Sequence, residues 1–311
     1  MRPILVVPAL AFLTAGAVTG VTPPPEAIAT ILDAFRTHAV VAIDEPHGDE
    51  QSHAFRLSLI RDPRFAAVVN DILVEFGNSR YQAVMDRFVS GERVPDEELR
   101  KVWQNTTQVH TIWDRPIYEE SFRVVRTLNA TLPPDRQLRV LLGDPPIDWD
   151  AIRTEEDLRS ARKSLPGRST HPADVLIKES LAKRRRSLVV YGGLHLIRQN
   201  ATGPNLIEHV ERAGGTRAFV VLTHPLARLD AIGVNPETWP YPRLALPGDS
   251  SLASQMDAVL YLGPKSSRTS SRLTAALCSD RRYLEMRIRR MTLGGNKNAA
   301  EQLDKECAGA R

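Results

Sequence analysis

The chain has 311 residues, of which 42% are hydrophobic and 25% are charged, and its net charge is +4. These proportions are those of an ordinary globular protein, and they exclude a fully disordered or fibrous chain. The excess of positive charge is small and scattered, and only 6% of the residues are aromatic. We therefore expect no nucleic-acid partner, because such surfaces need clustered cations and stacking side chains.

The first twenty residues have the pattern of a secretory signal peptide. Arg2 is the only charged residue among the first 25, and residues 4–18 are almost wholly apolar and are followed by small residues. A membrane-spanning helix needs about 20 apolar residues, and Pro8 and Gly16 interrupt this shorter stretch. We expect residues 1–20 to be removed and the mature chain to be periplasmic or secreted, without stable membrane insertion. A membrane anchor and a buried first strand are the alternatives.

A first helix is expected over residues 25–36, and six short apolar runs of strand length follow it. The runs lie at 39–43, 71–76, 138–142, 187–191, 218–222 and 258–262. Continuous apolar runs are typical of strands that are buried on both faces. Helical patterns separate several of them, at 51–61, 172–184 and 204–213. This alternation predicts an α/β fold with a mostly parallel central sheet flanked by helices.

Residues 79–135 interrupt the alternation, because they contain helical patterns and no convincing strand. We interpret them as a helical insertion after the second strand, and we expect the charged stretch 148–185 to be helical too. The chain then divides into a signal peptide (1–20), a linker with the first helix (21–38), an α/β domain (39–263) and a C-terminal helical segment (264–311).

The two cysteines, Cys278 and Cys307, both lie near the C-terminus. An even number of cysteines in an exported chain permits a disulfide, and two free thiols are the alternative that the sequence leaves open. No second pair of ligands lies at zinc-site spacing from these cysteines, so the pair does not predict a zinc site.

Polar and ionisable side chains gather where the expected strands end. Each of the first five strands runs into a turn that carries a carboxylate or an imidazole: Glu45 with His47, Glu75, Asp144, His195 and His224. If the strands are parallel, their carboxyl ends face one crevice, which is where open α/β sheets bind ligands. A structural role is the alternative for Glu75, as an ion pair with Arg56 or Arg80, and for Asp144, as the start of a turn.

The spacing around His47 resembles the superfamily that joins erythromycin esterases, ChaN-like haem-uptake proteins and Tiki/TraB proteins. Glu45 and Gly48 flank His47 as in the first motif of that superfamily, with the glutamate two residues before the histidine as in ChaN-like members. Arg56 lies nine residues after His47, and Glu75 lies 28 residues after it. Erythromycin esterases carry an arginine and a glutamate at those two positions.

Two further stretches look like the ChaN-like branch. One is the stretch 81–92 followed by Trp103 and Trp113, and the other is the strand that ends in Gly-Gly-x-His at 192–195. The resemblance covers about residues 39–215. It implies either hydrolysis at this site or the binding of haem or iron.

For hydrolysis, two mechanisms fit these residues. In the first, His47 is a general base that activates a water molecule. Glu45 or Glu75 orients its imidazole, and Arg56 stabilises developing negative charge. In the second, as the Tiki-like members imply, His47, Glu75 and His195 hold a divalent metal such as Mn, Zn, Co or Fe. We expect an exported hydrolase of an ester or amide whose catalytic residues are Glu45, His47, Arg56, Glu75 and His195.

Binding without catalysis is the competing hypothesis, and a cleft that has lost its activity is a third. Haem needs an axial ligand and an apolar slot. The aromatic residues of the insertion can line such a slot or pack the insertion against the sheet; they are Tyr81, Trp103, Trp113 and Tyr118. The candidate binding residues for a small-molecule substrate or for haem are Asn78, Arg80, Tyr81, Trp113 and Asp144.

Overall fold

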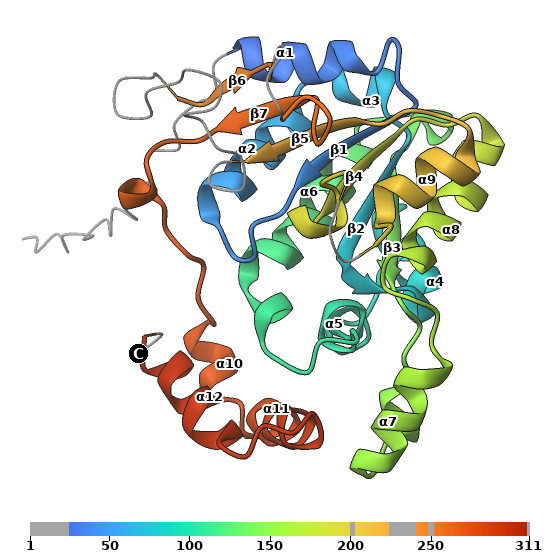
Figure 1. Cartoon of the computed structure of the whole chain (residues 1–311). Helices are drawn as coiled ribbons and strands as arrows, with labels where there is room; N and C mark the ends of the chain where they lie inside the picture. Colours follow the sequence, from blue (N-terminus) through green and yellow to red (C-terminus); the bar gives the residue numbers. More distant parts are fainter. Residues whose placement is uncertain (1–24, 200–202, 224–240, 248–251, 310–311) are drawn as a thin grey trace, which may run out of the picture.

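The computed structural model describes residues 25–199, 203–223, 241–247 and 252–309 (Figure 1). The expected signal peptide and His224 lie outside these residues. The described part of the chain forms a seven-stranded sheet in the order β3-β2-β4-β1-β5-β7-β6. All neighbouring strands are parallel except β6, which runs antiparallel to β7. The predicted α/β class with a mostly parallel sheet is therefore confirmed.

Six strands lie where the apolar runs predicted them: β1 (Val40–Asp44), β2 (Asp71–Asn78), β3 (Arg139–Asp144), β4 (Ser187–Tyr191), β5 (Phe219–Thr223) and β7 (Ala258–Tyr261). Every residue of β1, β2, β4 and β7 is buried, as expected for strands covered on both faces. The edge strand β6 (Arg243–Ala245) was not predicted, because it has only three residues and all are partly exposed.

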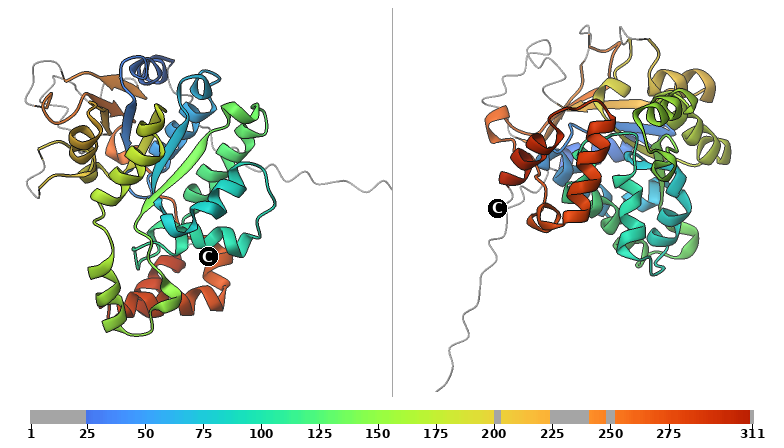
Figure 2. Two further views of the ribbon diagram at one scale, coloured as in Figure 1. Left: turned by 90° about the vertical axis from the view of Figure 1, so that its right-hand side faces the viewer. Right: turned by 90° about the horizontal axis from the view of Figure 1, so that it is seen from below.

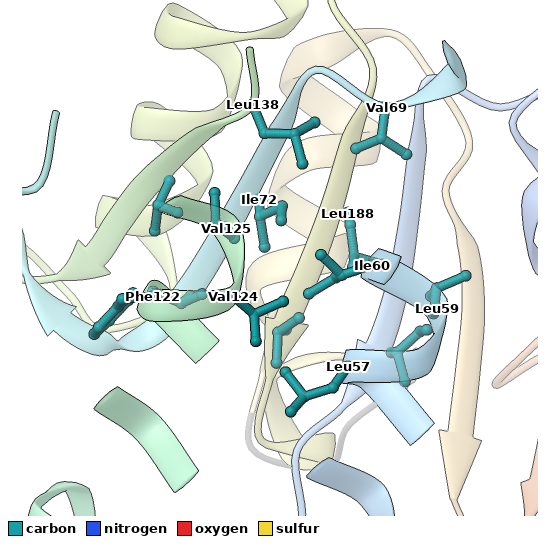
Figure 3. Close-up of a cluster of buried hydrophobic side chains, with 14 of the residues drawn as sticks. Leu57, Leu59, Ile60, Val69, Ile72, Phe122, Val124, Val125, Leu138 and Leu188 are labelled. Carbon is teal, nitrogen blue, oxygen red and sulfur yellow. The ribbon is translucent and has the colours of Figure 1, made fainter. Parts of the chain in front are cut away.

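Helices cover the two faces of the sheet in unequal numbers. One face carries α1 (Pro25–Ala34), α2 (Glu50–Arg61), α3 (Phe65–Val68), α4 (Gln82–Val89), α5 (Asp96–Gln104) and α6 (Pro116–Asn129). The other carries α8 (Thr170–Glu179) and α9 (Leu206–Gly214). Figure 3 shows part of the larger apolar cluster, which joins α2 and α6 to the sheet. The expected insertion is helical, since α4, α5 and α6 all lie within it.

The order of the strands predicts a ligand-binding crevice between β1 and β4, which are direct neighbours. The chain leaves β1 for α2 on one face of the sheet and leaves β4 for α9 on the other face. Neighbouring strands whose connections depart to opposite faces leave a crevice beyond their carboxyl ends, and ligands of open α/β sheets bind in such crevices. The turns that follow β1 and β4 are therefore the expected place for a site.

Local signals in the sequence fix the helices that border this crevice. The carboxylate of Asp49 caps α2 by accepting a hydrogen bond from the backbone N of Ser52 at 2.7 Å. At α9, Asn205 and Glu208 form a reciprocal capping box, and Gly215 ends the helix in a left-handed conformation at φ 60°. Both turns of the crevice thus lead into helices whose starting points are well defined.

The C-terminal segment is helical, as predicted, and comprises α10 (Ala275–Ser279), α11 (Arg281–Leu293) and α12 (Ala299–Ala308). It lies below the sheet, on the side toward which β1 and β2 point, together with α7 (Glu155–Ser164) (Figures 1 and 2). Of the two alternatives left open, the structure has the disulfide, between Cys278 and Cys307. None of the described helices has the length and apolar character needed to cross a membrane.

A buried ion pair joins this segment to the insertion. Asp114, in the short 3-10 helix η2 (Ile112–Asp114), accepts hydrogen bonds from Arg287 and, at 2.6 Å, from the hydroxyl of Tyr283. The side chains of Asp114 and Arg287 have essentially no exposed surface. Buried charges persist only where a partner compensates their lost hydration, so this contact fixes the segment against the insertion.

Replacing Asp114 by Ala is expected to lower the free energy of unfolding by about 3–5 kcal/mol, because it leaves Arg287 buried without a counter-charge. Urea denaturation of D114A and the wild type measures this loss. Glu285→Ala in the same segment is the matched control, since Glu285 pairs with Arg281 at the surface and such pairs contribute about 0–1 kcal/mol. Equal losses in the two variants would contradict the assignment.

Candidate functional site

His47 and Glu45, which follow β1, form a close hydrogen-bonded pair. Nδ1 of His47 lies 2.6 Å from Oε2 of Glu45. Because an ionised carboxylate only accepts hydrogen bonds, Nδ1 carries the proton of the neutral imidazole and Nε2 carries the lone pair. The side chain of Glu45 has no exposed surface, whereas that of His47 is 35% exposed. The pair thus presents one basic nitrogen toward an accessible part of the crevice.

Two helices supply the partners that the buried carboxylate of Glu45 needs. Tyr118 of α6 donates its hydroxyl to Oε1 at 3.1 Å, and Nη2 of Arg56 from α2 lies 3.7 Å from the same oxygen. The Tyr118 hydroxyl also accepts the backbone N–H of Gly48 at 2.8 Å, which ties down the loop after His47. Burial alone would raise the pKa of Glu45, but the hydrogen bond from His47 and the charge of Arg56 outweigh it and lower that pKa.

The same contacts have the opposite effect on the pKa of His47. Burial favours the neutral imidazole, but the hydrogen bond to Glu45 and the negative charges of Glu45 and Glu75 outweigh it and raise the pKa of His47 above its usual value. Trp113 packs its edge against the imidazole, with the ring centres 4.7 Å apart. The ring therefore has a fixed position as well as a fixed tautomer.

Glu75, near the end of β2, is the second buried carboxylate of the site. Its Oε2 accepts the backbone N–H of Gly192 at 2.8 Å, and its Oε1 accepts a hydrogen bond from Arg168 at 2.7 Å. A Cβ on Gly192 would lie 3.1 Å from Oε2 of Glu75 and 3.2 Å from Cε1 of His47. The glycine after β4 thus allows the carboxylate and the imidazole to approach the same stretch of backbone.

His195, three residues after Gly192, faces the same carboxylate. Its Nε2 lies 3.6 Å from Oε1 of Glu75, and its Nδ1 lies 3.3 Å from the hydroxyl of Ser169. Burial lowers the pKa of His195, and Arg168 and His47 add to this effect against the attraction of Glu75. The two histidines of the crevice therefore have pKa values that move apart, with His195 the one that stays neutral to lower pH.

Two further carboxylates at strand ends are held by threonines. Asp144 of β3 accepts hydrogen bonds from the backbone N of Thr107 at 2.6 Å and from its hydroxyl at 2.5 Å. Asp44 of β1 accepts the backbone N and hydroxyl of Thr223 at 2.7 and 2.9 Å. Burial raises the pKa of both acids to about 7 despite these bonds. Asp144 lies near Glu75 and Arg168, whose charges act on it in opposite directions.

The remaining expected binding residues have structural partners. Asn78 is buried and donates to the backbone oxygen of Asn105 at 2.6 Å, and Arg80 forms an ion pair with Asp148 at 2.8 Å. The hydroxyl of Tyr81 accepts a hydrogen bond from Asn105 at 2.8 Å. In the hydrogen bonds and ion pairs of the described residues, none of these three side chains joins the cluster around His47. Trp113 is the exception, through its contact with the imidazole.

The sequence did not identify the ionic partner of Glu75. The sequence offered Arg56 or Arg80 for it, but Arg56 lies beside Glu45 and Arg80 pairs with Asp148. The cation beside Glu75 is Arg168, which comes from the loop between α7 and α8. Its only sequence signal is the preceding Pro-Gly pair, which marks a turn but not what the turn approaches.

The expected metal ligands do not fit a metal centre. Within the part of the chain that is described, no group of three or more His, Cys, Asp or Glu residues is arranged to hold a metal ion. Glu75 already uses one oxygen for Arg168 and the other for Gly192, and the guanidinium occupies the approach of a cation. Nδ1 of His47 is likewise engaged by Glu45. We derive no chemical step through a metal.

The aromatic residues of the insertion pack it against the sheet. Trp103, Trp113 and Tyr118 are at most 3% exposed and belong to the larger apolar cluster. Phe76 of β2 lies against Trp113 and Tyr118, with ring centres 6.1 and 4.9 Å apart. Of the two readings that the sequence left open for these aromatics, the structure has the packed one, so none of these three lines an open slot.

Comparison with known proteins gives distant structural likenesses only. No protein-family model matches the chain, and no curated protein matches it. Among solved structures, ChaN of Campylobacter jejuni, described with cofacially bound haem, is 14% identical with a TM-score of 0.43. That match covers 76% of this chain and 90% of ChaN.

Two other solved structures are similar to the same degree. The type III effector HopBA1 is 15% identical with a TM-score of 0.42, and a Bacillus cereus protein is 11% identical with a TM-score of 0.47. Each match covers 77% of this chain and 94% of the other chain. At such identities the function has to be derived from the residues of the site itself.

Proposed function

We propose that the chain is a hydrolase of esters or amides in which His47 is the general base. The observation that carries the proposal is the 2.6 Å hydrogen bond between Nδ1 of His47 and the buried carboxylate of Glu45. It leaves Nε2 with the lone pair on a side chain that is 35% exposed. This is the arrangement that activates a water molecule in general-base catalysis.

In the proposed reaction, Nε2 of His47 takes a proton from a water molecule while the water oxygen attacks the carbonyl carbon. The imidazolium that forms is stabilised by Glu45 and Glu75. When the tetrahedral intermediate collapses, Nε2–H returns the proton to the leaving oxygen or nitrogen. Arg168 is 43% exposed and lies beside Glu75, so its guanidinium is the nearest candidate to stabilise the oxyanion. Arg56 is only 5% exposed and acts by holding Glu45 ionised.

We also propose that the protein works outside the cytoplasm. The apolar, small-residue pattern of the first twenty residues supports export. The disulfide between Cys278 and Cys307 supports an oxidising compartment, because such bonds persist there and are rare in a reducing cytosol.

Haem or iron binding of the ChaN type is the alternative. His47 and His195 are partly exposed and are the imidazoles that would serve as axial ligands. The buried state of Trp103, Trp113 and Tyr118 argues against the slot that those residues were expected to line. The hydrogen-bonded base favours hydrolysis.

Replacing His47 by Ala is expected to lower the turnover of 4-nitrophenyl acetate or an aryl amide by about 10²–10⁴-fold, the usual contribution of a positioned base. Circular dichroism checks that the variant is folded. His209→Gln on α9 is the matched control, since His209 lies outside the cluster around Glu75. Turnover that survives in H47A would overturn the assignment of the base.

The pH dependence follows from the raised pKa of His47. The base works only when unprotonated, so kcat/KM is expected to rise with pH, with a midpoint above the ordinary value of about 6.5. In Glu45→Gln the acceptor shape remains but the charge is lost, so the midpoint is expected to move to lower pH. Rate profiles and NMR titration of the imidazole measure both. Glu120→Gln, beside His53 rather than His47, is the control, and a midpoint unchanged in E45Q would contradict the pairing.

Activity is expected to survive treatment with a chelator, because both oxygens of Glu75 are engaged by Arg168 and Gly192. Elemental analysis and an absorption spectrum of the same preparation complete the test. A stoichiometric metal that is lost in H47A would contradict the metal-free mechanism and support the metal-dependent one. A Soret band after mixing with haem, absent in H47A or His195→Ala, would move it to the haem-binding class.

A further inference from the structure

Arg115, directly before α6, places its guanidinium against the loop that carries His47. A Cβ on Gly48 would overlap Nη1 of Arg115, and Gly48 has φ 80°, in the left-handed region. Both the conformation and the space therefore require glycine at this position. The residue beside the proposed base is one that leaves room for a cation.

The guanidinium of Arg115 has no acceptor among the described residues, in contrast to the other arginines near the site. Arg56 lies beside Glu45, and Arg168 donates to Glu75. No hydrogen bond or ion pair of the described chain involves the side chain of Arg115. An arginine has five N–H donors in a planar fork that suits a carboxylate or phosphate, so this one is available to an anionic ligand.

Arg115 lines a groove of about 370 Å³ between the insertion and the C-terminal segment. The other charged residues of its lining are Arg272, Lys305 and Glu306. Glu306 accepts hydrogen bonds from Thr111 and Gln302, so both of its carboxylate oxygens already have partners within the protein. Lys305 is paired with Glu301 at 2.7 Å. Arg115 and Arg272 against Glu306 still give the lining a net positive charge, which attracts anions.

The groove adjoins the proposed base on two sides. Gly48 follows His47 directly, and its carbonyl accepts the backbone N–H of Ser271, a residue of the groove wall, at 2.8 Å. Trp113, two residues before Arg115, lies against the imidazole of His47. A substrate whose carbonyl group lies beside His47 can therefore place a second group in the groove.

We propose that Arg115 binds a carboxylate or phosphate group of the substrate, so that the substrate is an anionic ester or amide. This inference rests on the proposed hydrolase function and names its substrate class. Arg115 is a specificity residue in it: it binds a group remote from the bond that is cleaved. Arg272 adds attraction without being required for the bidentate contact.

The kinetic test compares 4-nitrophenyl acetate, which is neutral, with mono-4-nitrophenyl succinate, which carries a free carboxylate. The wild type is expected to prefer the succinate ester, and Arg115→Gln to lose about 10–100-fold of kcat/KM on that ester with less than a twofold change on the acetate. Arg115→Lys keeps the charge and is expected to recover part of the preference. Arg123→Gln, at the surface of α6, is the matched control. A charge preference that is unchanged in R115Q would overturn the inference.

Calorimetric titration separates this inference from the proposed function, because it needs no turnover. Succinate and inorganic phosphate are titrated separately at low ionic strength, and the tighter of the two identifies the anion. Binding is expected in the wild type and in H47A and is expected to be lost in R115Q. Loss of turnover in H47A with anion binding that persists in R115Q would leave the hydrolase intact and overturn the inference. Binding that depends on Arg115 in a protein without hydrolysis would overturn the hydrolase and keep the anion site.

Discussion

The site depends on one charged group, the carboxylate of Glu45, which is buried at the carboxyl end of the central strand. A buried carboxylate is stable only when hydrogen bonds and opposite charges replace its hydration. Here the replacements come from three parts of the chain: His47 from its own loop, Arg56 from α2 and Tyr118 from α6. The helical insertion, which the α/β pattern does not require, thus supplies one of the contacts that keep Glu45 ionised.

His47 follows β1 and His195 follows the neighbouring strand β4, and their environments give them different pKa values. Of the two histidines only His47 is hydrogen-bonded to Glu45, which raises its pKa, whereas burial lowers the pKa of His195 and Arg168 adds to that effect. Glu75 forms an ion pair with Arg168 at 2.7 Å and lies 3.6 Å from Nε2 of His195. An unequal pair of this kind allows one imidazole to cycle a proton while the other stays neutral.

Much of this arrangement could be predicted from the sequence, because it follows from the strands. Apolar runs located six strands, and the polar residues at their ends included Glu45, His47, Glu75 and His195, which a parallel sheet necessarily brings to one edge. Their roles were harder to predict. The set His47, Glu75 and His195 looked like metal ligands only because the partners of the carboxylates could not be seen.

The positions of Arg168 and Arg115 could not be predicted from the sequence, for one reason. Arg168 comes from the loop between α7 and α8, and Arg115 comes from the insertion on the other face of the sheet from α8. Where such a residue ends up depends on how whole helices pack, and no local periodicity encodes that. The short edge strand β6 escaped prediction for a related reason, since its three half-exposed residues have no pattern of their own.

The C-terminal segment had no function assignable from its sequence, yet it borders the site directly. Asp114 is held by Arg287 of this segment, and the residue before it, Trp113, lies against the imidazole of His47. The backbone around Ser271 pairs with Gly48, and α12 supplies Lys305 to the groove. The disulfide between Cys278 and Cys307 links α10 to α12 and closes the stretch that carries Arg287 and Lys305. Because the segment contacts both the loop after His47 and Asp114, the neighbour of Trp113, it borders the site and helps to fix the position of its base.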